Sequence, residues 1–593
     1  MNKKKSNVLL MSFITTFIVV VAVALLIWLV VLPIARQFRG GDFLANRDVI
    51  PFHEFFTLDP EVSQLVLDDQ RLRDTIAPIV EYRDGDYHVY LPAEFLRQQL
   101  DPFLFWDDGA NTFFVSTRYE MLEFVPGRAR FYVNGSPRPL DTPIKRIDNE
   151  IFLPADLVQG LYPLFIEYQP QYNMVVITSA LLPQTRGAVT ANGVAVRYRP
   201  ETRAPITVQL DQENEVVILG DVSEDFIRVR TPQGLLGYIA ADDIGEIYTV
   251  DRIATGLPIL HSWIDNTVSY PPFWRGGPIN LVWEVATNQD ANLLRMQMPL
   301  HDSVTVVSPT WFDFDRDNLN LSTNVSRAYI EWAHDQGVYV WPKVFDYNNV
   351  TARAILMNRD ARRRVINQLI RYVDEYNFDG INIDIEHLLN AEEGPYKIQF
   401  LRELAIPMRE RGIVLSAAVK VPAPWTMFYR RDLIALTVDF VMVMTYDEHY
   451  ATSAVSGPVA SLPWVHQAVI NMLEEVPREQ LLMGLPFYNR LWREVVLDDG
   501  PPGVRSRSMD YTLEFFEERG VLWEWDPEVG SYYGEVAVIE DGEAVLWRVW
   551  LECERSITAK MQIYVMHDLA GVASWRRGWE NEETWEVLGR HFP

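Results

Sequence analysis

The chain has 593 residues, enough for several domains, and an apolar content of 48% that is ample for buried cores. Its formal net charge of -28 argues against a nucleic-acid partner, because one polyanion repels another. The single cysteine, Cys553, excludes an intramolecular disulfide and any cysteine-based zinc or redox motif. We therefore expect a multidomain protein that does not bind nucleic acid and is held together by apolar cores.

The N-terminus combines a short basic tail with a long apolar run. Three lysines, Lys3 to Lys5, precede the uncharged residues 8–34, which are numerous enough to span a bilayer as a helix. The leading lysines favour a cytoplasmic N-terminus. The run exceeds the core of a usual signal peptide and no clear cleavage site follows it, so residues 1–40 are predicted to be a cytoplasmic tail and a transmembrane signal anchor. The bulk of a single-pass membrane protein would then be extracytoplasmic, and cleaved secretion is the alternative.

Residues 45–182 contain an internal repeat. Residues 90–93 (Tyr-Leu-Pro-Ala) return as 152–155 (Phe-Leu-Pro-Ala), and residues 111–116 return at the same offset as 173–178. The shared offset indicates that a whole unit of strand, short helix and strand is duplicated. This segment resembles the domain named after the N-terminus of copper amine oxidases, which implies an α+β stalk that serves as a spacer or interaction module. No cluster of His and Cys with metal-ligand spacing is visible, so we expect no metal.

Residues 184–248 change to short strands separated by turns, a pattern that predicts a small all-β barrel. The pattern is similar to a bacterial SH3 domain, with residues 237–239 (Gly-Tyr-Ile) at the position of its closing strand. The resemblance implies binding of cell-wall peptides, and a passive spacer is the alternative.

From residue 253 to residue 593, apolar strands alternate with helical patterns, which predicts an α/β fold of the (β/α)8 TIM-barrel type. A longer insertion separates the last two strands. The candidate strands are residues 279–285, 304–309, 338–341, 378–386, 414–419, 440–447, 481–486 and 572–575. In such barrels the active site lies at the C-terminal ends of the strands.

The fourth candidate strand contains the sequence Asp379-Gly380-x-Asn382-x-Asp384-x-Glu386. Isoleucines alternate with Asn382, Asp384 and Glu386, so the three polar side chains share one face of a strand that we expect to be buried on both sides. Buried carboxylates are costly unless they are paired or used, and glycoside cleavage uses a carboxylic acid beside a second stabilising group. The strand therefore predicts a glycosidase site with Glu386 as the acid. A strand whose polar face is merely hydrogen-bonded is the alternative.

The motif resembles the signature of glycoside hydrolase family 18, the chitinase-like family, whose signature strand is the fourth of a (β/α)8 barrel. Asn382 replaces the family's usual Asp, as in a branch that includes spore-cortex N-acetylglucosaminidases. Residues 444–447 (Met-Thr-Tyr-Asp) and Trp575, at the ends of the sixth and eighth strands, resemble two further motifs of the family. The segment around Glu552 and Cys553 resembles part of the spore branch.

The resemblance implies a retaining mechanism in which the substrate's own acetamide is the nucleophile. Glu386 is then the acid and later the base for water, Asp384 stabilises the acetamide, and Tyr446 holds its oxygen. We also expect the Asn382 amide to donate a hydrogen bond to Asp384. No metal or organic cofactor is implied. The implied substrate-binding residues are Asn382, Asp447, Trp575 and Glu552, with a surface position equally open for Glu552, and the structural residues of the motif are Asp379 and Gly380. Candidate cleft aromatics, for which packing is the favoured alternative, are Trp425, Tyr488, Trp492 and Trp579.

These observations predict a membrane-anchored glycosidase that hydrolyses β-1,4-linked glycans containing N-acetylglucosamine, with peptidoglycan favoured, in cell-wall or spore-cortex remodelling. The expected partners are this polysaccharide, the membrane and cell-wall peptides bound by the SH3-like domain. The rival is a catalytically silent glycan-binding or scaffold protein on a chitinase-like barrel. Because binding-only relatives tend to lose the acid, the presence of Glu386 favours the enzyme. The sequence does not decide whether the substrate is chitin or peptidoglycan, or whether cleavage is internal or terminal.

Overall fold

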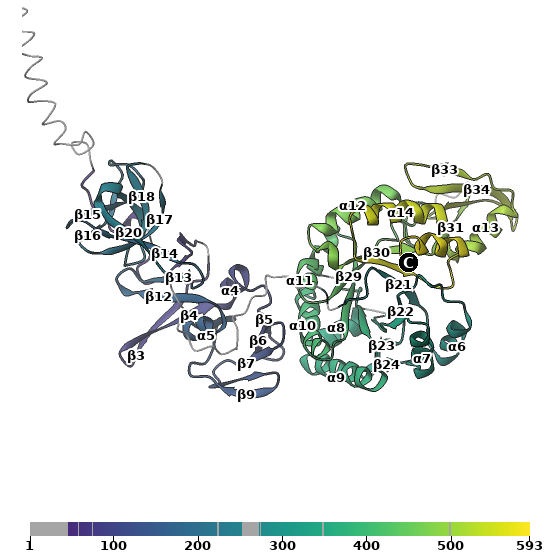
Figure 1. Ribbon diagram of the computed structural model, residues 1–593, viewed down its shortest axis with the longest axis horizontal. Helices are drawn as coiled ribbons and strands as arrows, with labels where there is room; N and C mark the ends of the chain where they lie inside the picture. Colours follow the sequence, from purple (N-terminus) through teal and green to yellow (C-terminus); the bar gives the residue numbers. More distant parts are fainter. Residues whose placement is uncertain are drawn as a thin grey trace, which may run out of the picture. The chain divides into compact units, whose positions relative to one another are not determined.

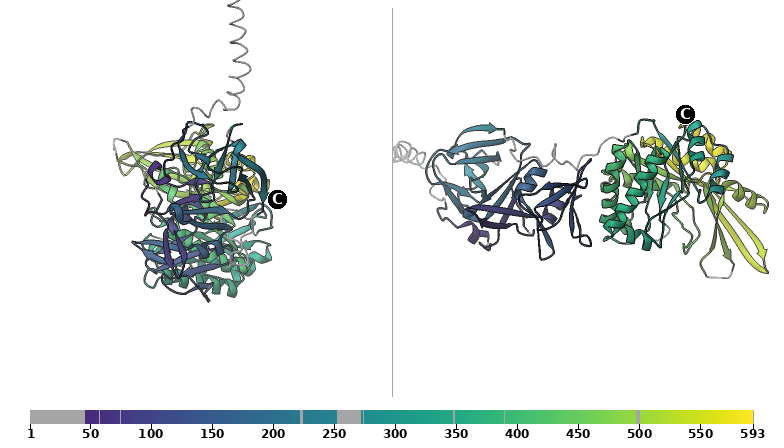
Figure 2. Two further views of the ribbon diagram at one scale, coloured as in Figure 1. Left: turned by 90° about the vertical axis from the view of Figure 1, so that its left-hand side faces the viewer. Right: turned by 90° about the horizontal axis from the view of Figure 1, so that it is seen from below.

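The computed structural model describes residues 46–592 except 57, 74, 222–223, 252–271, 273, 347–348, 389 and 497–499. The chain divides into two compact units, one made of Met1–Phe95 with Ile144–Ile264 and the other of Leu96–Pro143 with Asp265–Pro593 (Figures 1 and 2). Among the described residues, no helix is long and apolar enough to cross a membrane. The anchor predicted for residues 8–34 lies outside the described residues.

The first unit contains the first strand of each repeat copy, and these two strands pair with each other, whereas residues 111–116 of the first copy belong to the second unit. Strands β4 (Asp86–Pro92) and β11 (Glu150–Pro154) run antiparallel, with Phe152 opposite Pro92. A short helix follows each strand, α4 (Ala93–Gln99) and α5 (Ala155–Leu161), as the repeat predicts. Two four-stranded sheets, β10-β11-β4-β3 and β12-β13-β1-β2, result. The other elements are α3 (Phe52–Phe56), β1 (Gln64–Leu67), β2 (Gln70–Arg71), β3 (Ile79–Arg83), β10 (Lys145–Ile147), β12 (Leu164–Gln169) and β13 (Met174–Ser179).

The same unit contains a seven-stranded sheet in the order β16-β15-β19-β18-β17-β14-β20, which confirms the predicted small all-β domain. Val196, Val229 and Ile239 lie at its apolar centre. Gly237 is required in β19, because a Cβ atom there would lie 2.5 Å from the Val196 side chain. The strands are β14 (Gln184–Val189), β15 (Val194–Arg197), β16 (Ile206–Leu210), β17 (Glu215–Asp221), β18 (Phe226–Arg230), β19 (Leu236–Ala240) and β20 (Ile244–Val250).

The second unit is built on a parallel barrel, which confirms the predicted TIM-barrel fold (Figure 1). The third strand is broken at Pro342 into two pieces, which pair with the strands on either side and close the barrel. The barrel strands are β21 (Ile279–Glu284), β22 (Val306–Pro309), β25 (Tyr339–Val340) with β26 (Lys343–Phe345), β27 (Gly380–Asp384), β28 (Val414–Lys420), β29 (Phe440–Met444), β30 (Leu481–Pro486) and β36 (Gly571–Trp575), with the short pair β23 (Phe312–Phe314) and β24 (Leu321–Thr323) at one edge.

Helices cover the outside of the barrel, and α9 illustrates why they form. Asn358 caps its first turn by accepting from the Ala361 amide, and Asn377 ends it in the left-handed conformation. Val365 and Leu369 form part of its buried face, as the helical spacing predicts. The helices are α6 (Gln289–Gln297), α7 (Arg327–Asp335), α8 (Asn349–Leu356), α9 (Arg359–Tyr376), α10 (Gly394–Glu410), α11 (Arg431–Ala435), α12 (Leu462–Leu473), α14 (Glu554–Met566) and α15 (Glu582–Gly589).

The insertion predicted before the last barrel strand folds as a five-stranded antiparallel sheet, in the order β32-β31-β35-β34-β33, with one helix. Trp547 and Phe516 lie in its apolar core. Its elements are β31 (Tyr488–Val495), β32 (Gly503–Ser508), α13 (Met509–Glu517), β33 (Glu524–Asp526), β34 (Ser531–Glu540) and β35 (Glu543–Leu551).

Residues 96–143, the middle of the predicted stalk, pack on the barrel helices α9 and α10. Asp107 forms an ion pair of 2.9 Å with Arg362, and the two side chains are 1% and 0% exposed. Arg402 donates to the Ser116 side chain at 2.8 Å. The compact units therefore cut through the segment that the repeat marks as one stalk. The strands are β5 (Phe105–Asp107), β6 (Thr112–Ser116), β7 (Met121–Phe124), β8 (Arg130–Val133) and β9 (Ser136–Pro139).

Candidate active site

The two residues that begin the signature motif fix the start of β27. Asp379 accepts the Val340 amide at 2.8 Å and contacts the His334 ring at 2.9 Å, which ties β27 to the strand before it. Gly380 leaves room for Trp341, because a Cβ atom at this position would lie 2.6 Å from the indole. Both residues are therefore part of the packing at the start of β27.

The backbone just beyond β27 is held by three side chains from neighbouring elements. The Glu386 amide donates to Asp346 at 3.1 Å, and the Tyr429 hydroxyl donates to the Glu386 carbonyl at 2.5 Å. The buried Lys397 on α10 donates to the Ile385 carbonyl at 2.9 Å. These bonds fix where Glu386 emerges from the barrel.

Asp384 is the last residue of β27 and forms a buried ion pair that sequence reasoning missed. Its Oδ2 contacts the ammonium of Lys343 on β26, and the two side chains are 2% and 9% exposed. Its other oxygen, Oδ1, is buried and has no hydrogen-bond partner among the described residues. A buried acceptor without a partner is costly, so Oδ1 is suited to receive an N–H from a ligand.

Asn382 does not donate to Asp384, which corrects our expectation. Its Oδ1 accepts the Trp283 indole N–H at 3.0 Å, and its amide nitrogen donates to Ser416 at 3.2 Å and to the Met442 sulfur at 3.2 Å. The side chain is fully buried, and the direct substrate contact expected of Asn382 stays a prediction. Donors and acceptors from across the barrel saturate the amide before a neighbour on the same strand reaches it.

The electrostatic environment of Glu386 suits a proton donor. Burial raises the pKa of Glu386 most, and the negative charge of Asp384 raises it further. The positive charges of Lys343 and Lys420 oppose this shift of the pKa, and the Lys420 ammonium lies 3.8 Å from the Glu386 carboxylate. The carboxyl group therefore holds its proton to a higher pH than an exposed glutamate does.

Tyr446 and Asp447 follow β29. Burial, and then the charges of Asp384 and Glu386, raise the pKa of Tyr446 well above its ordinary value, so its hydroxyl remains a donor. This hydroxyl has no hydrogen-bond partner in the part of the chain that the structure describes. Asp447 accepts from Tyr488 and from Arg490, both on β31, and its side chain is partly exposed. The insertion thus orients Asp447 at the strand end.

Trp575 ends β36 and completes the group. The Lys343 ammonium lies 4.6 Å from its ring centre, and the Trp283 ring lies 6.1 Å from it. Lys343 therefore links Asp384 to Trp575, and the ends of the fourth and eighth strands meet as the sequence predicts. No group of three or more His, Cys, Asp or Glu side chains within the described ranges is arranged to hold a metal ion.

The comparisons with known proteins identify the family of the domain that contains these residues. Residues 341–579 match the family described as Glycosyl hydrolases family 18. The chain carries a family 18 glycosyl hydrolase domain. This confirms the resemblance and the enzyme class, a glycoside hydrolase, that the motif predicts. Residues 66–177 match the Copper amine oxidase N-terminal domain and residues 192–245 the Bacterial SH3 domain, as expected.

Relatives of the family 18 domain include bacterial glycosylases. The uncharacterized glycosylase YvbX of Bacillus subtilis (strain 168) is 23% identical over 303 residues, which are 49% of this chain and 85% of that protein. The cortical fragment-lytic enzyme of the same organism is 25% identical over 255 residues, 42% of this chain and 57% of that protein. The solved Bacillus megaterium QM B1551 spore cortex-lytic enzyme SleL aligns with a TM-score of 0.47 at 19% identity, covering 53% of this chain and 74% of that chain.

Glu552 lies in a buried ion pair within the family 18 domain. Its carboxylate pairs with Lys560 of α14 at 2.8 Å, with the two side chains 1% and 0% exposed, and accepts from Ser556 at 2.7 Å. The surface position is therefore wrong, and the substrate contact stays a prediction. Glu552 is a buried structural anion at the start of α14.

The four candidate cleft aromatics of the domain differ in how far their side chains are buried. Trp492 and Tyr488 are buried, and Trp579 is half-buried against Tyr488 and Arg576. Trp425 is 76% exposed and lies in the segment that follows β28, beyond the C-terminal end of that strand. Of the four rings, only that of Trp425 is presented largely to solvent.

Three residues around the motif were missed by sequence reasoning in addition to Lys343. Asp346, buried just beyond β26, accepts the Glu386 amide and contacts the His387 ring at 3.1 Å. The Asp346 carboxylate beside this ring raises the pKa of His387. Tyr429 holds the Glu386 carbonyl. The available signal was position, since Lys343 and Asp346 lie at the end of the third strand, as active-site residues of a barrel do.

Proposed function

We propose that the protein is a membrane-anchored glycosidase that hydrolyses β-1,4-linked glycans containing N-acetylglucosamine, with peptidoglycan as its substrate. The observation that carries this proposal is the unpartnered, buried Oδ1 of Asp384 beside Glu386 and Tyr446. An acetamido group has an N–H donor and a carbonyl acceptor. Asp384 offers an acceptor and Tyr446 a donor, so the pair is chemically complementary to such a group.

In the mechanism that we propose, the acetamide oxygen attacks the anomeric carbon while the glycosidic bond breaks. Glu386 transfers its proton to the leaving oxygen, and the ring that forms carries a positive charge. Asp384 stabilises that charge through the acetamide N–H, and Tyr446 donates to the acetamide oxygen. Glu386, now ionised, then takes a proton from the water that opens the ring. The configuration at the anomeric carbon is retained.

The properties of Glu386 favour an enzyme over a catalytically silent protein that only binds glycans. Glu386 is partly exposed and its pKa is raised by burial and by Asp384, which is the state that a general acid requires. Peptidoglycan is favoured over chitin because the SH3 domain accompanies the barrel and one relative is named a cortical fragment-lytic enzyme. We extend this to a role in cell-wall or spore-cortex remodelling, with cell-wall peptides as ligands of the SH3 domain.

The test is to incubate the full chain, purified in detergent, with peptidoglycan and with chitin oligomers. New reducing-end sugars are reduced with borohydride and identified by mass spectrometry. We expect new reducing ends of N-acetylated sugars from peptidoglycan, and none with Glu386→Gln. A folded wild-type chain that cuts neither polymer overturns the proposed activity, and cleavage of chitin alone overturns the proposed substrate.

A further inference from the structure

The ion pair between Lys343 and Asp384 is costly for stability. Both side chains are almost completely buried, and taking two charges out of water costs several kcal/mol per ion, which their attraction often fails to recover. The pair also occupies one oxygen of the carboxylate that the proposed mechanism uses. A role in the reaction is therefore the better explanation for its presence.

Asn382 leaves Asp384 dependent on Lys343. In the Asp form of the motif, Asp384 can share a proton with its neighbour, whereas here that neighbour is a neutral amide bonded to Trp283, Ser416 and Met442. In this chain the Lys343 ammonium thus takes the place of the proton that two neighbouring aspartates can share when the motif has Asp at position 382. The other titratable groups that act on Asp384 or lie beside it are Glu386 beyond β27, Asp346 beyond β26, Lys397 on α10, Tyr429 and Tyr446.

We propose that Lys343 is a positioning residue for the acetamide reaction. It holds the Asp384 carboxylate in place through Oδ2 and leaves Oδ1 directed to the substrate N–H. The Lys343 ammonium also lies 4.6 Å from the Trp575 ring centre, so the same contact sets the distance between the carboxylate and the aromatic floor. This inference rests on the proposed function.

The test compares Lys343→Met with Lys343→Arg and with Lys343→Met/Asn382→Asp. The matched control is Lys560→Met, which breaks an equally buried ion pair away from the motif. Thermal unfolding and circular dichroism identify folded protein, and kcat, KM and the pH profile of kcat are measured on peptidoglycan. Lys343→Met should lower kcat about 100-fold with little change in KM. The second substitution, Asn382→Asp, should restore kcat at least about tenfold and move the pH profile, because a shared proton then replaces the ammonium.

Three outcomes would overturn the role of Lys343 alone: an unchanged kcat in folded Lys343→Met, an equal loss in Lys560→Met, or no recovery of kcat in the double variant Lys343→Met/Asn382→Asp. These results require that the wild-type chain is active. A folded wild-type chain that cuts no glycan instead overturns the proposed function and this inference with it. The two failures are therefore distinguishable.

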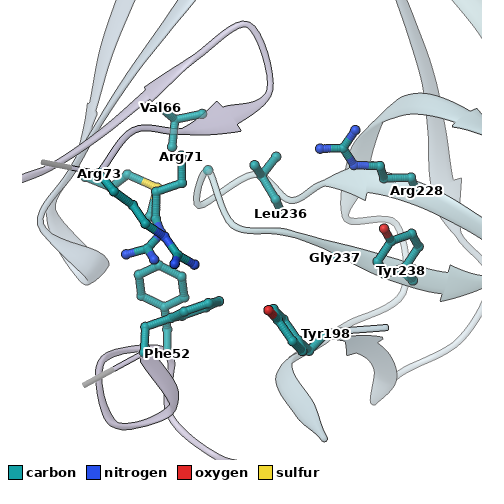
Figure 3. Close-up of a pocket in the computed structure, with 12 residues that line it drawn as sticks. Phe52, Val66, Arg71, Arg73, Tyr198, Arg228, Leu236, Gly237 and Tyr238 are labelled. Atoms are coloured by element: carbon teal, nitrogen blue, oxygen red, sulfur yellow. The ribbon is translucent and has the colours of Figure 1, made fainter. Parts of the chain in front are cut away.

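A different observation, in the unit that contains the SH3-like sheet, carries a second inference. A cavity of about 200 Å³ lies between that sheet and the strands β1, β2 and β13 (Figure 3). Three arginines line it together with aromatic rings. The residues that matter are Arg71, Arg73, Arg228, Phe52, Phe56 and Tyr198.

The arginines of this cavity are poorly compensated. Within the described residues, no carboxylate forms an ion pair with Arg71 or Arg73. Burial lowers the pKa of Arg71, and the neighbouring charge of Arg73 lowers it further. Arg228 donates to the backbone carbonyl of Asp69 at 3.0 Å. In a chain of net charge -28, two guanidinium groups without such a partner, with a third on the wall of the same cavity, favour an anion there.

We infer that this cavity binds a phosphate group. Three guanidinium groups offer more donors than the two oxygens of a carboxylate accept, whereas a phosphate has additional oxygens. The Arg71 guanidinium lies 4.4 Å from the Phe56 ring centre, so it is held in place beside an apolar wall. That wall fits the carbon chain attached to a phosphate ester. The phosphate could be carried by a lipid headgroup or by a phosphodiester polymer.

Calorimetric titration of the full chain in a non-ionic detergent tests this, with glycerol phosphate, a glycerol phosphate polymer, short-chain phosphatidylglycerol and acetate as probes. We expect saturable, salt-sensitive binding of the phosphate probes, weakened at least about tenfold by Arg71→Gln/Arg73→Gln and unchanged by Arg146→Gln, an exposed arginine of the same unit. Whichever of the glycerol phosphate polymer and phosphatidylglycerol binds more tightly identifies the molecule that carries the phosphate group. Absence of phosphate binding, equal binding of acetate, or binding that survives the double substitution overturns the inference.

Discussion

Replacing Glu386 by Gln keeps the shape of the side chain and removes its transferable proton. General acid catalysis contributes about two to four orders of magnitude in rate, which corresponds to about 2.7–5.4 kcal/mol in the activation free energy. We expect a loss of kcat in this range on an unactivated glycan. An aryl glycoside, whose leaving group needs no proton, should lose less in the bond-breaking step. Stopped-flow measurement of the released phenol separates this step from the later attack of water.

The pH dependence of Glu386 gives the same prediction a second readout. The wild-type rate should fall as pH rises through the raised pKa of Glu386, because the acid must be protonated. A raised folded-state pKa means that Glu386 contributes stability below its unfolded pKa and that this is lost as pH rises through the folded value. At neutral pH, Glu386→Gln should therefore unfold at no lower temperature than wild type. Undiminished activity in the folded variant would refute the assignment of the acid.

Four further predictions address the substrate, the acetamide contact, the docked segment and the anchor. De-N-acetylated glycan should not be cut even if it binds, and efficient cleavage of glucosamine oligomers by the chain would contradict the acetamide mechanism. Tyr446→Phe should weaken a thiazoline analogue of the cyclised intermediate by about 1–3 kcal/mol through a lost hydrogen bond, measured as the inhibition constant. Asp107→Ala should cost about 3 kcal/mol in the free energy of unfolding, because Arg362 stays buried with one of its two carboxylate partners removed and Glu403 left at 3.2 Å; an unchanged urea midpoint would argue against this. Protease added to intact cells should digest the chain beyond residues 8–34, and full protection of the barrel would exclude the predicted topology.

The fold and the strand ends were predictable because they depend on local alternation and on strand order. Asp384, Glu386, Tyr446 and Trp575 lie where the motifs indicate, at the ends of barrel strands. These patterns repeat over a few residues, and a barrel brings their ends together whatever the loops contain. The gross position of a site is therefore readable from such a sequence.

The partners of those residues were not predictable, because they come from distant parts of the chain. Asn382 is adjacent in the strand to Asp384, yet Trp283, 99 residues away, takes its carbonyl oxygen. Lys343 follows the break at Pro342 in the third strand. Its strand, β26, pairs with β27, and the helices α8 and α9 separate the two strands in the sequence. Glu552 is a local exception, since its buried partner Lys560 lies only eight residues on, in α14. Hydrogen-bond competition in the folded core decides all of these contacts.

The seating of residues 96–143 on α9 and α10 determines where the chain can be shortened. Phe103 belongs to the apolar core of the barrel, and Phe105 and Phe114 pack with Ile406 of α10. A catalytic fragment begun at the first barrel strand would expose these contacts and would leave Arg362 without Asp107 and Arg402 without Ser116. Such a fragment should aggregate on expression, whereas one that begins upstream of residue 96 should remain in solution. The smallest independently folding hydrolase is therefore larger than the barrel itself, and its N-terminal boundary lies inside what the repeat marks as another domain.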